Sequence, residues 1–79
     1  MPLLGEIRLF PYNFTPKGWV ICDGRTLPIA RFTAVFALVG TQFGGDGRET
    51  FGLPALTGKE PAPDLRYCIC IEGEFPSHG

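Results

Sequence analysis

The side chains that could carry catalysis are few and poorly grouped in this 79-residue sequence. The single histidine, His78, stands one residue from the carboxyl end, where a residue belongs to a frayed tail more often than to a catalytic centre. Asp23 and Asp46 could in principle serve as an acid and a base. Each stands beside a glycine in a predicted turn, however, where aspartate is favoured for local hydrogen bonding. We therefore expect no catalytic residues and no enzymatic activity.

Motifs for metal and cofactor binding are also incomplete. Structural zinc takes four cysteine or histidine ligands, usually in two close pairs, whereas only one residue separates Cys68 from Cys70 and Cys22 stands alone. The glycine-rich segment 44–47 lacks both the lysine of a phosphate loop and the acidic series of a calcium loop. We expect no metal and no cofactor. The residues assigned instead to structural loops are Asp23, Gly24, Gly44, Gly45, Asp46, Gly47 and Pro54.

The three cysteines, Cys22, Cys68 and Cys70, allow at most one intrachain disulfide. Cys68 and Cys70 point the same way if they lie in a strand. Two interpretations remain open: a bridge from Cys22 to one of the other two, or three buried thiols that pack as small hydrophobic groups.

Composition favours a protein partner over a nucleic acid or a membrane. Hydrophobic residues form 44% of the chain and charged residues 19%, which is more apolar surface than so short a chain can easily bury. The net charge is −1, without a block of like charge, so a nucleic-acid partner is not expected. The longest mostly apolar run, 29–39, is too short to span a bilayer, and no secretory signal is recognised. We expect synthesis in the cytoplasm, with lysis or a dedicated machine as the route outward.

Periodicity predicts a few short elements. Alternation over residues 5–10 predicts a half-buried strand, and the run 19–22 predicts a second strand that ends at an Asp-Gly turn. Residues 30–39 have helical spacing and Gly40 ends them, and residues 40–54 form a loop. Residues 66–72 form a last strand, which we expect to be central or covered because both of its faces are apolar. The expected fold is α+β, a small antiparallel sheet with one packed α-helix and long Gly/Pro-rich loops, in a single domain 1–79.

The predicted helix is apolar on two sides. One face carries aromatic and β-branched residues at i, i+3, i+4 and i+7, while Ala34, Ala37 and Leu38 occupy its back. In a domain of this size the second cover is as readily supplied by another subunit as by the same chain, so we expect a homo-oligomer. The predicted assembly interface comprises Phe14, Trp19, Phe32, Val35, Phe36, Val39 and Phe75.

Six short motifs follow one another in the order of a known family: GEIRLF at 5–10, GWVICDG at 18–24, LPI at 27–29, FALVG at 36–40, GGDG at 44–47 and FGLP at 51–54. In this order and spacing the chain resembles the phage tail collar domain family. The closing segments, 67–71 and 73–77, are similar to the microcystin-dependent-protein branch of that family. The resemblance implies a small mixed domain at the distal end of a tail or short tail fibre, often trimeric, with no catalytic residues.

Two departures from the family pattern affect the expected function. Ala55 and Thr57 stand where family members usually have Asp and Arg. Longer relatives insert a Gly- and His-rich tract before the final strand, whereas this chain crosses the same gap with residues 59–64 alone. The chain therefore resembles a minimal collar that lacks the receptor-facing insert.

Three functions follow as hypotheses. The first is a homo-oligomeric structural module of a phage tail tip, short tail fibre or phage-derived particle, assembled with copies of itself and with other tail proteins as further partners. The second is a self-assembling extracellular filament subunit in which sheet edges pair. The third is a carbohydrate-binding adhesin that uses Trp19 and the neighbouring aromatic residues Tyr12, Phe10, Phe14, Phe43 and Phe75.

Overall fold

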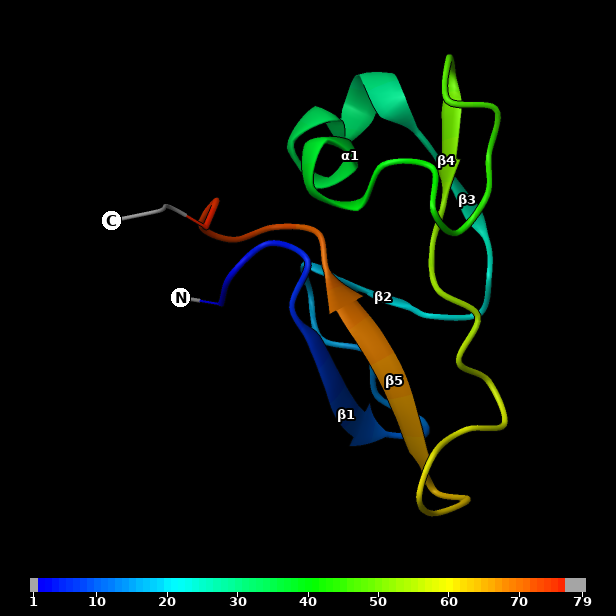
Figure 1. The fold of residues 1–79 in the computed structure, drawn as a ribbon. Helices are drawn as coiled ribbons and strands as arrows, with labels where there is room; N and C mark the ends of the chain where they lie inside the picture. Colours follow the sequence, from blue (N-terminus) through cyan, green and yellow to red (C-terminus); the bar gives the residue numbers. More distant parts are fainter. Residues whose placement is uncertain (1, 77–79) are drawn as a thin grey trace.

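The computed structural model describes residues 2–76, which form two small antiparallel sheets and one short helix (Figure 1). Strands β1 (Ile7–Pro11), β5 (Leu65–Cys70) and β2 (Trp19–Ile21) form the first sheet in the order β1-β5-β2. Strands β3 (Thr26–Pro28) and β4 (Thr50–Gly52) form the second. A 3₁₀ turn, η1 (Ile29–Arg31), leads into helix α1 (Thr33–Val39).

The predicted α+β class with a single sheet is wrong. Strands and bridges hold 32% of the described residues and helices only 13%, and the strands fall into two sheets. The second sheet was missed because β3 and β4 have only three residues each. They also contain Pro28 and Gly52, and proline and glycine are residue types that are rare inside strands. Their pairing, Thr26 with Gly52 and Pro28 with Thr50, joins segments that are distant in sequence and leave no local pattern.

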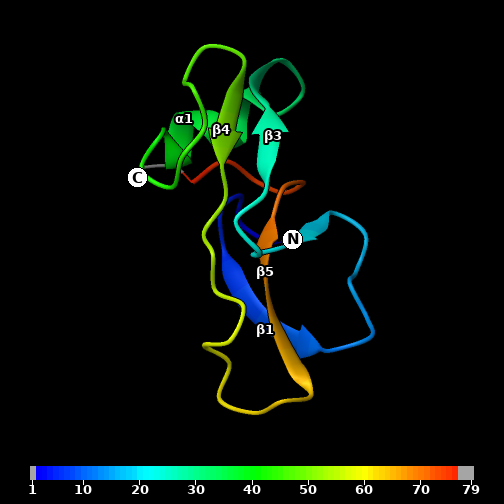
Figure 2. The same cartoon turned by 90° about the vertical axis from the view of Figure 1, so that its right-hand side faces the viewer.

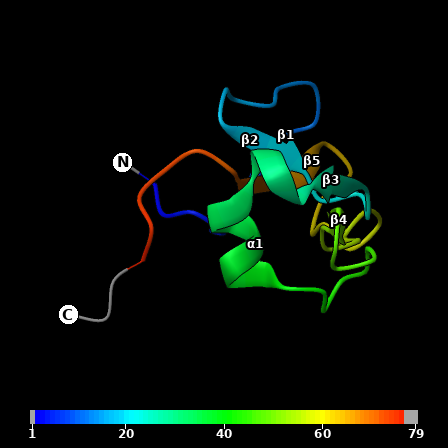
Figure 3. The ribbon, with the colours of Figure 1, turned by 90° about the horizontal axis from the view of Figure 1, so that it is seen from above.

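The last strand, β5, is the centre of the three-stranded sheet, as its apolar faces predicted. It pairs antiparallel with β1, Arg8 opposite Cys68, and with β2, Ile21 opposite Cys68. Beyond β5 the chain runs back beside the amino-terminal segment, where the Leu4 amide donates to the Glu74 carbonyl at 2.8 Å (Figure 3). The segments before β1 and after β5 are therefore held together by backbone hydrogen bonds.

Helix α1 is shorter than the sequence predicted because residues 29–31 form a separate 3₁₀ turn and Phe32, with φ of −135° and ψ of 46°, interrupts the helical backbone before Thr33. The N-cap residue of α1 is Phe32, and no side chain caps the N-terminus of the helix. It ends at Gly40, whose φ of 62° suits a residue without Cβ and whose amide donates to the Phe36 carbonyl at 2.8 Å.

The core lies where α1, β4 and β5 meet. Val35, Phe51 and Ile69 come from these three elements and are at most 1% exposed. The Phe36 and Phe51 rings pack with their centroids 5.5 Å apart. Further core residues are Leu4, Cys22, Val39 and Leu53. Figure 2 shows the β3–β4 pair standing above the three-stranded sheet, with the connection from β4 to β5 running down one side.

Candidate functional site

An uncovered apolar surface lies on β1 beside α1. Ile7 is opposite Ile69 in the register and Leu9 is opposite Tyr67, so both β1 side chains share the core-facing side of the sheet. Ile69 is 1% exposed, yet Ile7 and Leu9 are 41% and 37% exposed. Figure 1 shows α1 and the second sheet at one end of the molecule, with β1 extending away from them. This part of the sheet face therefore has no second layer among the described residues.

Helix α1 approaches the chain just before this strand. The Cδ1 atom of Leu38 lies 3.7 Å from the position of a Cβ on Gly5, so Leu38 reaches the chain just before β1. Leu38 is 37% exposed, and Ala34 and Ala37 beside it are exposed as well. We call Ile7, Leu9 and Leu38 the β1–α1 patch.

The predicted interface residues on the helix need correction. Val35 and Val39 are 1% and 9% exposed and pack in the core of their own chain, so no partner can reach them. Phe32 and Phe36 are partly buried against the same core. The spacing identified the buried face of α1 correctly, but that face meets β4 and β5 because the missed second sheet supplies its cover. The back of the helix, including Leu38, is the uncovered side.

The remaining predicted interface residues come from segments outside the helix. Phe14 and Phe75 are 55% and 53% exposed. Trp19 is half-buried; the Phe10 ring meets its ring edge-on, with centroids 5.0 Å apart, and the Arg8 guanidinium lies 5.6 Å from its centroid. Since Phe10 and Arg8 already pack against the indole, the aromatic residues around Trp19 do not form one open sugar-stacking surface.

The cysteines are free thiols, and the register separates them. Ile21 and Cys68 are opposite each other and share one face of the first sheet, so the side chain of the next residue, Cys22, points to the other face. Cys70 shares the face of Cys68. A bridge from Cys22 therefore has no support in this fold. All three are buried, and burial, followed by the nearby Cys68, raises the pKa of Cys22 to about 11.

The loop residues around Asp46 organise the chain before β4. One carboxylate oxygen of Asp46 accepts the backbone amides of Arg48, Glu49 and Thr50 at 2.8, 2.9 and 3.0 Å. These bonds, that of Thr50 foremost, lower the pKa of Asp46 to about 2. The aspartate therefore stabilises the loop as an anion.

Glycines in the same loop allow close backbone approach. Gly45 has φ of 82°, and a Cβ there would lie 2.4 Å from the Phe51 Cα. Gly44 and Gly47 also have positive φ. Only glycine fits at Gly45 without displacing β4.

The turn after β2 is held by Asp23. Its carboxylate accepts two side-chain bonds from Arg25, at 2.9 and 3.0 Å, and the pKa of Asp23 is lowered chiefly by this partner. The Gly24 amide donates to the Pro54 carbonyl at 3.2 Å, and the backbone of Asp23 forms an isolated antiparallel β-bridge with that of Ala55. The turn therefore anchors the chain that follows β4.

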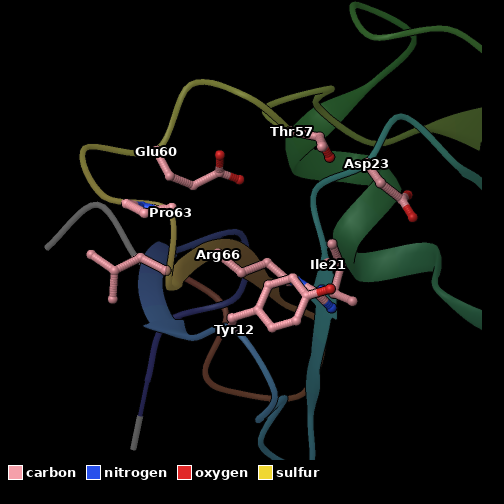
Figure 4. A pocket seen from close by; sticks show the side chains of 8 residues that line it. Tyr12, Ile21, Asp23, Thr57, Glu60, Pro63 and Arg66 are labelled. Carbon is pink, nitrogen blue, oxygen red and sulfur yellow. The ribbon is translucent and has the colours of Figure 1, made fainter.

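A pocket of about 370 Å³ lies between the end of β1, β2, the start of β5 and the connection 56–65 (Figure 4). Its lining residues are Tyr12, Ile21, Asp23, Thr57, Glu60, Pro63, Leu65 and Arg66. Sequence reasoning missed this site because its charged members lie alone in the chain and carry no motif. The prolines of residues 54–63 are a signal that could have drawn attention to it, because they stiffen the chain.

No cluster of metal-binding side chains and no membrane-crossing helix occurs within residues 2–76. No three His, Cys, Asp or Glu residues there are grouped to hold an ion. The described helices are too short to cross a bilayer. His78 lies outside the described residues. The expectations of no metal, no cofactor and no catalysis stay predictions.

The fold and its surfaces define a small β-rich module with an exposed apolar surface on β1. Residues 5–61 match the family model of the phage tail collar domain, which confirms the resemblance seen in the motifs. The chain therefore belongs to the phage tail collar domain family, a structural family of phage tails. A comparison with curated proteins finds no match.

Proposed function

We propose that this chain is a non-enzymatic structural module of a phage tail fibre or tail tip, and that it assembles with copies of itself. Family membership supports the structural role. The core, to which both sheets and the helix contribute, supports treating residues 1–79 as one domain. The proposed location is the virion or a phage-derived extracellular particle, with other tail proteins as further partners.

The uncovered side of β1 is the observation that carries self-association. Ile7 and Leu9 belong to the same row of side chains as Ile69 and Tyr67, which the chain covers, but they are themselves open to water. Large apolar residues grouped on an exposed face mark interaction sites in proteins of this size. Leu38 on the neighbouring helix enlarges the same face. A second copy would supply the missing layer over these three side chains.

The free edge of β1 argues for a closed oligomer rather than an open filament. Tyr12 and Glu6 hydrogen-bond to the β5 side, so the alternating residues Ile7, Leu9 and Pro11 present their backbone outward. Pro11 has no N–H and interrupts the free edge after Leu9. Because this free edge is short, it is a poor site for adding a strand from another copy. Association through the apolar face is therefore favoured over pairing of sheet edges.

Sedimentation velocity at micromolar concentration tests this proposal with three proteins. The native chain is expected to sediment as an oligomer. Leu38→Asp places a charge on the exposed patch, so the fold is kept and the protein becomes monomeric. Phe14→Asp is the matched control, because Phe14, although the sequence predicted it in the interface, is an exposed apolar residue outside the β1–α1 patch and receives the same charge.

Circular dichroism checks that each variant is folded. Loss of association in Phe14→Asp with retention in Leu38→Asp would refute the assigned face. Electron microscopy separates closed particles from fibres, and regular fibres would favour the filament subunit instead.

A further inference from the structure

The pocket beside Tyr12 is built by backbone contacts on both of its walls. The Leu56 amide donates to the Cys22 carbonyl at 2.9 Å, and the Tyr12 amide donates to the Asp64 carbonyl at 2.8 Å. The connection between β4 and β5 is therefore fixed to β2 at one end and to β1 at the other. Pro61 and Pro63 restrict its backbone between these points. A wall held in this way loses little freedom when a ligand binds.

One side of the pocket is apolar and carries the Tyr12 ring, one face of which is covered by Arg66. The Tyr12 side chain is 57% exposed, and the Arg66 guanidinium lies 4.3 Å from its ring centroid. Ile21 and Leu65, both partly buried, line the hollow with Pro63. Figure 4 shows the Tyr12 ring in front of Arg66. A ligand that enters therefore meets an apolar floor with the Tyr12 hydroxyl at its edge.

The polar groups around this floor offer both donors and acceptors. Arg66 forms no ion pair with an acidic side chain of residues 2–76, so its donors are open to a ligand. One oxygen of Glu60 accepts the Gly58 amide at 2.9 Å, which leaves the other oxygen free as an acceptor. Thr57 adds a hydroxyl. The carboxylate of Asp23 is already bound to Arg25.

We propose that this pocket binds one neutral hexose unit. A pyranose ring presents an apolar face of C–H groups to an aromatic side chain and hydroxyls that both donate and accept at its rim, which matches Tyr12 with Arg66 and Glu60. The carboxylate of Glu60 balances the charge of Arg66, so the pocket does not favour an anion, and the polar rim disfavours a purely apolar ligand. The volume lies near the lower limit of small-molecule pockets, roughly 300 Å³, and suits a single ring.

Saturation-transfer NMR with the methyl glycosides of glucose, galactose and N-acetylglucosamine tests the proposal. At least one glycoside is expected to receive saturation from the native protein. Tyr12→Ala should weaken that binding about tenfold, because the stacking surface is lost. Phe14→Ala should leave it unchanged, since Phe14 is equally exposed but does not line the pocket.

An amide-shift map of the native protein keeps the proposal falsifiable if Tyr12→Ala does not fold. The bound glycoside should move the signals of Tyr12, Thr57 and Glu60. Absence of binding by all three glycosides, shifts centred elsewhere, or an equal loss in Phe14→Ala would overturn the assignment. Tighter binding of methyl glucuronide would also overturn it, because Arg66 would then hold an anion. The pocket shares no residue with the β1–α1 patch, so this result is independent of self-association.

Discussion

Gly45 is the position where a single methyl group should most directly test the packing of the loop against β4. Its φ is 82°, and an added Cβ would meet the Phe51 Cα at 2.4 Å and the Thr50 carbonyl oxygen at 2.7 Å. Both are backbone atoms of β4, so no side-chain rotation relieves the contact. Gly58 is the matched control, because its φ is 93° but a Cβ there meets nothing within 4 Å.

Comparing the two substitutions separates the cost of a positive φ, which both share, from the cost of the backbone contact, which only Gly45→Ala has. Gly58→Ala should cost roughly 1–2 kcal/mol of unfolding free energy, the penalty of a left-handed backbone at a residue with Cβ. Gly45→Ala carries the same penalty and adds about 1–3 kcal/mol for overpacking. In a domain of this size the extra cost lowers Tm by at least about 5 °C beyond the control. Thermal unfolding followed by circular dichroism measures the difference. Equal Tm values for the two variants would refute the close approach of the loop to β4.

Three further predictions concern the core, the loop and the thiols. Val35→Asp should unfold the chain, because an unpaired charge at a residue 1% exposed costs more than about 3 kcal/mol; a folded circular-dichroism spectrum would contradict the placement of α1. Because the folded pKa of Asp46 lies near 2, below its ordinary 3.8, its stabilisation is present above pH 4 and is lost as the pH falls toward 2. Thermal melts should show that Asp46→Asn removes this part of the acid dependence, and an unchanged slope would count against the loop. Mass spectrometry of the intact protein should show three thiols that are alkylated only after unfolding, since Cys22, Cys68 and Cys70 are buried. A mass that corresponds to one disulfide would contradict the strand register.

Local patterns predicted the elements that carry strong periodicity. The alternation before Pro11, the β-branched run at Trp19, and the final apolar strand correspond to β1, β2 and β5 of the structure. The helix and its end at Gly40 were also predicted, because apolar spacing and a terminal glycine are local signals. The order of the motifs identified the family.

The second sheet and the surfaces depend on distant contacts and could not be derived in the same way. β4 lies in a segment whose glycines indicated a loop, and it becomes a strand only because Thr26–Pro28 pairs with it. Its Phe51 then covers the face of α1 that carries Val35, which the sequence had assigned to a partner. The uncovered residues Ile7 and Leu9 could not be recognised from alternation, since alternation does not report which apolar side chains lack a second layer.

Native mass spectrometry at micromolar concentration tests the proposed self-association through the β1–α1 patch. The native chain should give the mass of an oligomer, and Leu38→Asp should give the mass of a folded monomer. A native chain that remains monomeric would contradict the claim.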